Sequence, residues 1–119
     1  MRTYSFEKLI VWQKAIAFTV AISKLTKQFP KEEMFGLSSQ IRRSSRSIST
    51  NIAEGSGKHS LKEKSRFTEY SYSSSLETIN HLIEAYQLEY ITNEQYVSFR
   101  ERLDEINAML DALYKSQTK

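Results

Sequence analysis

Apolar residues near the start of the chain recur at alternating intervals of four and three residues. This spacing places them along one stripe of an α-helix that we expect to run from about Leu9 to Gln28. The stripe consists of Val11, Ala15, Phe18, Ile22, Leu25 and Phe29. Pro30 ends the helix, because proline lacks a backbone N–H and excludes the preceding residue from helical geometry.

A second apolar set shares this helix and lies roughly 100–180° away from the first around the helix axis. Its members are Leu9, Trp12, Ile16 and Val20. A surface helix that buries only one side does not need a second apolar face. We therefore expect these residues to be buried in the centre of a helical bundle or covered by another subunit, which makes them candidate oligomer-interface residues.

A second helix is expected from about Leu37 to Glu54. Its core stripe is Leu37, Ile41, Ser45, Ile48 and Ile52. Three arginines lie on the opposite side: Arg42, Arg43 and Arg46. The segment is rich in serine, a mediocre helix former, so packing rather than intrinsic propensity must hold the helix together. Gly55-Ser56-Gly57 then provides a C-cap and a turn.

The third helix should begin at Ser60-Leu61-Lys62-Glu63, a capping-box pattern that satisfies free N–H groups at a helix start. An apolar stripe follows at the same four–three spacing: Tyr72, Leu76, Ile79, Ile83, Tyr86 and Tyr90. Tyrosines in such stripes are typical of a core or a subunit interface. Beside them run small residues that would allow another helix to approach closely: Ser71, Ser74, Thr78 and Ala85.

A second capping box, Thr92-Asn93-Glu94-Gln95, should open the fourth helix. Its core stripe is Tyr96, Phe99, Leu103, Ile106, Leu110 and Leu113. Its acidic residues face away: Glu101, Asp104, Glu105 and Asp111. Helices joined by short connections predict an all-α fold, an antiparallel up-down-up-down four-helix bundle. The second apolar set of the first helix favours its assembly into a homo-oligomer.

Composition supports this fold class and excludes several others. The chain has 119 residues, which fits a single domain over 1–119, with one proline and three glycines. So few turn formers argue against a β-sandwich or barrel. The absence of cysteine excludes disulfides, thiolate zinc sites and cysteine nucleophiles. The sequence has neither a long apolar run nor a signal-peptide pattern, so we expect a cytoplasmic protein. We also expect no cofactor.

The net charge of +3 hides a strong asymmetry along the chain. Residues 1–40 carry +3, residues 41–66 carry +5, and residues 67–119 carry −5. The basic middle favours a phosphate-contacting patch for RNA or DNA made of Arg42, Arg43, Arg46, Lys58, Lys62 and Arg66. The alternatives are a solvated face, or a basic surface that meets the acidic outer face of the fourth helix in a neighbouring subunit.

No residue set indicates catalysis or metal binding. The two histidines, His59 and His81, are 22 positions apart and lack the Glu-x-x-His partners that di-iron bundles need. Four polar residues without a nucleophile are expected to make interhelical hydrogen bonds or to cap helices: Asn51, Glu54, Ser74 and Glu77. We therefore expect no enzymatic activity.

Short motifs spread over nearly the whole chain give a family resemblance. They include Val11-Trp12, Phe29-Pro30, Phe35-Gly36-Leu37, Gln40-Ile41-Arg42-Arg43 and Asn51-Ile52-Ala53-Glu54-Gly55. In this respect the sequence resembles the bacterial four-helix-bundle proteins encoded by intervening sequences within 23S ribosomal RNA genes. It is also similar to their relatives, the accessory proteins of diversity-generating retroelements.

The resemblance implies a homopentamer, and for the retroelement relatives it implies binding of nucleic acid and of a reverse transcriptase. Together with the basic patch it favours a nucleic-acid-associated accessory or scaffold protein. The alternative is a module that binds a protein partner, such as a reverse transcriptase, without touching nucleic acid. No membrane association is expected.

Overall fold

The computed structural model describes all residues, 1–119, as helices with short connections and no strand. The four α-helices are α1 (Ile10–Leu25), α2 (Leu37–Ser56), α3 (Leu61–Gln87) and α4 (Asn93–Gln117). Three 3-10 turns flank α1: η1 (Ser5–Lys8), η2 (Thr26–Gln28) and η3 (Lys31–Glu33). None of the helices has a stretch long and apolar enough to cross a membrane.

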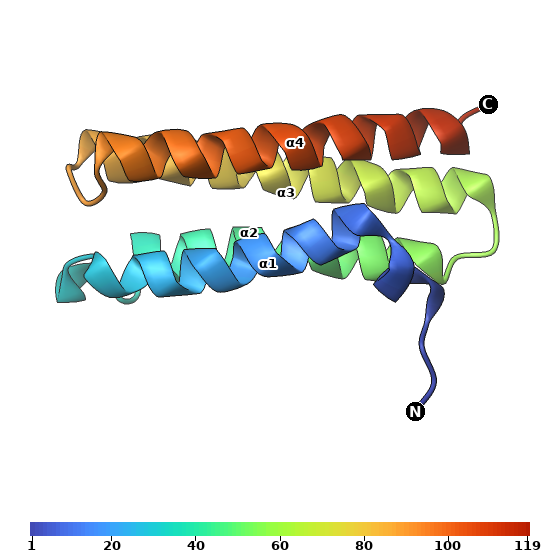
Figure 1. The fold of residues 1–119 in the computed structure, drawn as a ribbon, viewed down its shortest axis with the longest axis horizontal. Coiled ribbons are helices and arrows are strands. Elements are labelled where there is room, and N and C mark those ends of the chain that lie inside the picture. Colours follow the sequence, from blue (N-terminus) through green and yellow to red (C-terminus); the bar gives the residue numbers. More distant parts are fainter.

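The connections between the helices alternate between the two ends of the molecule (Figure 1). The α2–α3 connection and both chain termini lie at one end, which we call the terminal end, and the other two connections lie at the far end. The helices pack most extensively as α2 with α3, followed by α3 with α4 and α1 with α2, and α4 closes back on α1. α1 with α3 and α2 with α4 make no comparable contact.

The helix starts follow the capping signals in the sequence. Thr92 Oγ1 accepts a hydrogen bond from the Gln95 N–H at 3.1 Å, and Gln95 Oε1 accepts one from the Thr92 N–H at 2.9 Å. Ser60 Oγ accepts from the Glu63 N–H at 3.1 Å, but the Glu63 side chain turns to Arg66 instead of completing the box. The first helix ends before Pro30 as expected, although its last turn, η2, is 3-10 rather than α.

Three of the four predicted core stripes are confirmed. Every member of the first stripe of α1, from Val11 to Phe29, is buried, and so is the whole stripe of α2. In α4, Leu103, Ile106 and Leu110 are buried while the outer members of the stripe are partly buried against them. These residues form the greater part of one continuous apolar core.

The core interpretation of the tyrosine-containing stripe on α3 is wrong for three of its six members, while Ile79, Tyr86 and Tyr90 pack against the core. Tyr72, Leu76 and Ile83 are 42%, 48% and 40% exposed. The other members of the stripe are half-buried. The buried side of α3 is instead made mostly of small residues: Ser65, Thr68, Ser71, Ser75, Thr78, Leu82 and Ala85. Both stripes repeat at helical spacing, and the small one faces the core because it lets α3 lie close to α2.

Hydrogen bonds from small side chains of α3 join it to α2. Ser71 Oγ donates to the Ile48 carbonyl at 2.8 Å, and Thr78 Oγ1 donates to Ser44 Oγ at 2.8 Å. These bonds satisfy hydroxyl groups that are removed from water, which would otherwise carry a desolvation cost. The seam therefore combines polar pairing with the close approach that the small-residue stripe predicted.

Candidate functional site

The second apolar set of α1 is not buried in the centre of the helices. Leu9 and Trp12 are half-buried, whereas Ile16 and Val20 are 38% and 49% exposed. The first alternative for this set, burial in the bundle centre, is therefore wrong for Ile16 and Val20. A single chain leaves them facing solvent.

Ile16 and Val20 belong to the outer surface between α1 and α2. Thr19 Oγ1 donates to the Ser45 carbonyl at 2.9 Å, so this side of α1 adjoins α2. On α2 the same surface carries Arg46, which is exposed, and Arg42, which is half-buried. Neither arginine has an acidic partner within the chain. We call this surface the α1/α2 face: Ile16, Val20, Arg42 and Arg46.

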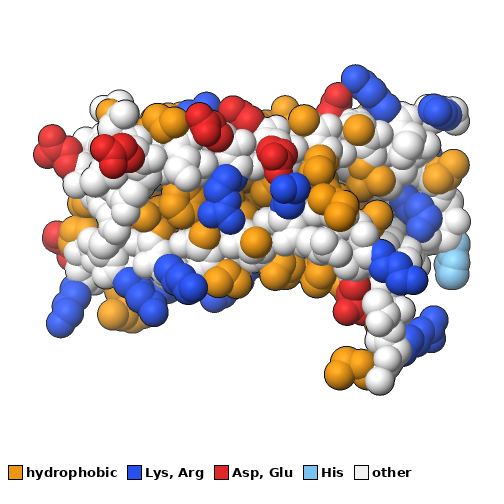
Figure 2. Space-filling model, viewed as in Figure 1, with side chains coloured by type: hydrophobic (Ala, Val, Ile, Leu, Met, Phe, Trp, Pro, Cys, Tyr) orange, Lys and Arg blue, Asp and Glu red, His pale blue; other side chains and the backbone are white.

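A second apolar surface lies between α3 and α4. It is formed by the exposed stripe of α3 beside exposed carboxylates of α4. We call it the α3/α4 face: Tyr72, Leu76, Ile83, Asp104 and Asp111. Because the helices pack in ring order, this face lies on the opposite side of the molecule from the α1/α2 face. Figure 2, which looks onto α1 and α4, shows acidic side chains over α4 and Lys and Arg side chains along the edge below α1.

The apolar parts of the two faces lie at the same level along the helices. The Thr19 bond to Ser45 places Ile16 and Val20 beside the segment of α2 from Ser44 to Ile48. The seam bonds place that segment beside α3 residues 71–78. Tyr72 and Leu76 fall within this range. The molecule thus presents two apolar patches at the same height along the bundle axis and on opposite sides. One patch is flanked by arginines and the other by carboxylates.

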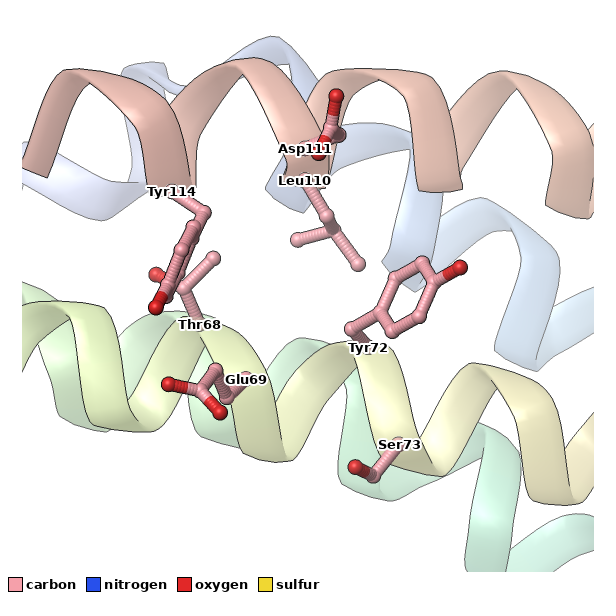
Figure 3. A pocket seen from close by; sticks show the side chains of 7 residues that line it. All are labelled: Thr68, Glu69, Tyr72, Ser73, Leu110, Asp111 and Tyr114. Atoms are coloured by element: carbon pink, nitrogen blue, oxygen red, sulfur yellow. The ribbon is translucent and has the colours of Figure 1, made fainter. Parts of the chain in front are cut away.

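A pocket of about 310 Å³ opens on the α3/α4 face. Its lining residues are Thr68, Glu69, Tyr72, Ser73, Leu110, Asp111 and Tyr114. Figure 3 shows Leu110 between the two tyrosine rings, with Glu69 below and Asp111 above in that view. The charge of Glu69 and its hydrogen bond with the Tyr114 hydroxyl raise the pKa of that tyrosine. The pocket therefore has aromatic walls and a negative potential.

The structure separates the six residues predicted to contact nucleic acid into two groups. Arg42, Arg43 and Arg46 lie on the middle of α2, while Lys58, Lys62 and Arg66 lie at the terminal end. Arg43 is held on the α3 side of its helix, where Nη2 donates to Glu77 Oε2 at 3.2 Å and to Gln40 Oε1 at 2.8 Å. The six residues do not form one continuous patch.

Further basic residues join the second group at the terminal end. Segments from both chain termini meet the α2–α3 connection there, as the shared lining of a small cavity by Ser5, Gly55, Lys64 and Gln117 illustrates. Residues 1–8, 54–66 and 115–119 together carry eight Lys or Arg and three Asp or Glu, a net charge of +5. Sequence reasoning missed the terminal segments, although the expected topology brings both chain ends to this connection.

The far end of the molecule has the opposite charge. Residues 26–36 and 84–94 contribute two lysines and five glutamates, a net charge of −3. The molecule is therefore electrically polar along its long axis as well as across its two apolar faces. An anionic partner is attracted to the terminal end and repelled from the far end.

Of the four predicted structural polar residues, Ser74 and Glu77 make contacts between helices, whereas Asn51 bonds within its own helix. Asn51 Nδ2 donates to the Ser47 carbonyl at 2.8 Å, and Ser74 Oγ donates to Ser47 Oγ at 2.9 Å, which links α3 to α2. Glu77 pairs with Arg43 across the same seam. The side chain of Glu54 is exposed and makes no hydrogen bond or ion pair.

Comparison with known proteins places this architecture in a family. The fold and its surfaces define an all-helical protein of four packed helices with two unpartnered apolar faces. The sequence model of the 23S rRNA-intervening sequence protein family matches residues 7–112, and the chain belongs to that family. The resemblance seen in the sequence motifs is thereby confirmed.

A solved structure supports the same assignment. The crystal structure of a protein of unknown function from the S23 ribosomal protein family of Bacteroides thetaiotaomicron is 33% identical to the chain, with a TM-score of 0.83. The match covers 89% of this chain and 99% of that one. No curated protein matches the chain.

Proposed function

We propose that this protein is a non-enzymatic scaffold that assembles through its two apolar faces and binds RNA or DNA through its basic terminal end. The proposal rests mainly on the two apolar patches, which lie on opposite sides of the chain at the same height along the bundle axis. One patch has basic neighbours and the other has acidic neighbours. Both patches leave aliphatic side chains in water, the α3/α4 face also exposes Tyr72, and each face has the charge that complements the other.

Contact between different faces of two copies is a heterologous interface, which closes into a ring when the rotation between copies permits it. Because the patches are level, a rotation about an axis parallel to the helices brings Ile16 and Val20 of one copy against Tyr72 and Leu76 of the next. A ring of five copies is the assembly implied by the family resemblance.

The charges at the two faces support the same register. Arg42 lies two residues from Ser44 and is therefore near the level of Asn80 on α3. The stacked rings of Tyr86 and Tyr96 align α3 with α4 and bring Asp104 to about that level. In a side-by-side assembly Arg42 thus approaches Asp104 of the neighbouring copy, which supplies the acidic partner that the single chain lacks.

Binding of nucleic acid is assigned to the terminal end, because the α2 arginines are occupied in this assembly. Lys58, Lys62 and Arg66 are exposed there together with basic residues of both chain termini. A ring would repeat this basic end in every copy on the same side, which multiplies the phosphate contacts. Such contacts give strong, salt-dependent binding with little sequence preference.

Two matched triple variants test the proposal. Lys58→Gln/Lys62→Gln/Arg66→Gln should reduce the slope of log affinity against log salt by about 2 to 3 for a short RNA or DNA duplex and leave the oligomer intact. Arg42→Gln/Arg43→Gln/Arg46→Gln should instead weaken self-association. If the second variant loses nucleic-acid binding while it stays assembled, the α2 arginines are the nucleic-acid contacts and the assignment to the terminal end is wrong.

An absence of binding would decide between the two function classes. Wild-type protein with no affinity for RNA or DNA at about 50 mM salt, where electrostatic binding is strong, would exclude the nucleic-acid role. The exposed apolar faces would then favour the alternative function, a module that binds a protein partner such as a reverse transcriptase.

A further inference from the structure

We propose that the pocket on the α3/α4 face is a guanidinium site that receives Arg46 from the neighbouring copy. This inference rests on the proposed assembly and assigns an occupant to the pocket. A pocket that is completed only by a second copy explains why aromatic and acidic side chains line an open hollow on the surface of a single chain.

The lining of the pocket has the chemistry that recognises a flat cation. Tyr72 and Tyr114 stand on either side of the apolar floor formed by Leu110 (Figure 3). Aromatic faces attract a guanidinium through their quadrupole and stack on its plane. Glu69 adds a carboxylate that can accept two parallel N–H bonds from the same group.

The charges of the surroundings select a cation over other ligands. Glu69 and Asp111 both belong to the lining, which contains no Lys or Arg, and Asp111 pairs with Lys115 at 2.9 Å. A phosphate or another anion would meet two carboxylates and no free positive group. The pocket is thus unsuited to the nucleic acid proposed for the terminal end.

Arg46 is the basic residue whose level fits the pocket. Ser47 accepts the hydrogen bond of Ser74, so Arg46 is at the height of residues 74–75 of α3 along the bundle axis, within one helical turn of Tyr72 and Ser73 and between one and two turns from Glu69. A neighbour related by rotation about an axis parallel to the helices keeps this level. Arg46 is exposed and has no partner in its own chain, so its guanidinium is available to enter the pocket.

The choice of Arg46 over the other arginines of α2 follows from their own contacts. Arg43 points to the α3 side and is already bonded to Glu77 and Gln40. Arg42 lies one turn further along the helix, at the level of Asp104. Only Arg46 combines the right level, an exposed side chain and the absence of an internal acidic partner.

The dissociation constant of the assembly, measured by sedimentation velocity over a dilution series, tests this inference. Arg46→Gln removes the cation from an exposed position and should raise the dissociation constant by about 10- to 100-fold. Arg46→Lys keeps the charge without the planar fork and should recover only part of this loss. Arg43→Gln is the matched control, and it should leave the dissociation constant unchanged.

A charge exchange identifies the partner in the pocket. Arg46→Glu and Glu69→Arg should each weaken assembly, and the double variant should restore it because the pair is re-formed in the opposite sense. Far-UV circular dichroism verifies that each variant is folded. Arg46→Gln, which changes only an exposed side chain, keeps the test valid even if the exchanged variants do not fold.

The outcomes separate this inference from the proposed assembly. If the wild type is an oligomer but Arg46→Gln associates as tightly as Arg43→Gln, the pocket does not receive Arg46 and the assembly stands. If Arg46→Gln weakens association but the double exchange does not restore it, Arg46 binds elsewhere and the pocket assignment is wrong. A wild type that is monomeric throughout the dilution series overturns both.

Discussion

The hydroxyl of Tyr90 donates a hydrogen bond of 2.8 Å to Oε2 of Glu33, joining the two connections at the far end of the molecule. The other oxygen of the same carboxylate, Oε1, accepts from the Leu37 N–H at 3.1 Å and so caps the first turn of α2. One carboxylate therefore fixes both the start of α2 and the chain that leads into α4. This contact does not depend on any partner molecule.

Acid should weaken the protein through this carboxylate. The hydrogen bond from Leu37 and, after it, the bond from Tyr90 lower the pKa of Glu33 from its ordinary value. A carboxyl group with a lowered pKa in the folded state stabilises the fold above its unfolded pKa, and this contribution is lost as the pH falls through the folded value. We expect the thermal midpoint of Glu33→Gln to fall less than that of the wild type between about pH 5 and pH 3.

Glu32→Gln is the control for this measurement, because Glu32 is exposed and makes no side-chain hydrogen bond or ion pair. Its thermal midpoint should follow the wild-type pH profile. An equal flattening of the profile in both variants would mean that the loss of stability in acid reflects general charge rather than the cap on α2.

The same contact predicts a second effect at high pH. The hydrogen bond to Glu33, followed by partial burial and the charge of that carboxylate, raises the pKa of Tyr90 to about 12. The neutral hydroxyl is thus favoured in the folded state, so its stabilisation is present at neutral pH and is lost as the pH rises from about 10 through 12. Ultraviolet titration should show that Tyr90→Phe has one late-ionising tyrosine fewer than the wild type, while Tyr114, whose pKa is also raised, remains in both.

Gly55 allows the close approach of α2 and α3 at the terminal end. A Cβ atom at this buried position would lie 2.8 Å from the Cβ of Phe67, so one helix must shift to admit it. We expect Gly55→Ala to lower the free energy of unfolding by about 1–3 kcal/mol, as overpacking does. Denaturant unfolding monitored by circular dichroism measures this change.

Gly57→Ala is the matched control, because a Cβ there meets only the Glu54 carbonyl at 3.6 Å, an ordinary contact. This substitution should change the unfolding free energy by less than about 0.5 kcal/mol. Equal effects of the two substitutions would show that the cost at Gly55 arises from the backbone rather than from contact with Phe67.

The absence of cysteine from the chain makes disulfide cross-linking a clean test of the proposed register. Val20→Cys and Leu76→Cys in one chain should give a ladder of covalent multimers on oxidation, because each copy links to the next. Either substitution alone should give dimers at most. Val20→Cys with Leu88→Cys is the control, since Leu88 is similarly exposed but lies at the far end of α3. A ladder from the control pair would contradict the side-by-side register.

The sequence predicted the helices and most of the core because their signals are local. Capping residues such as Thr92 act within one turn, and the stripes of α1, α2 and α4 are apolar on the side that is buried. The buried side of α3 could not be predicted from its apolar stripe in this way. That side is made mostly of serines and threonines, two of which, Ser71 and Thr78, form hydrogen bonds to Ile48 and Ser44 of another helix.

The candidate site could be predicted only in part, for a similar reason. The sequence placed Ile16 and Val20 on a second apolar side, which a surface helix that buries only one side does not need. The structure leaves both residues exposed. Their alignment with Tyr72 and Leu76 depends on the register between three helices. The division of the basic residues into two groups likewise depends on which ends of the helices meet.

Complementation between two single-face variants tests the central claim most directly. Val20→Asp disables the α1/α2 face and Leu76→Asp disables the α3/α4 face, so every contact in either pure variant contains a disabled face. Light scattering coupled to size-exclusion chromatography should find an oligomer for the wild type, a monomer for each variant, and a one-to-one dimer for their mixture. Variants that keep the wild-type mass, or a mixture that stays monomeric, would contradict assembly through opposite faces.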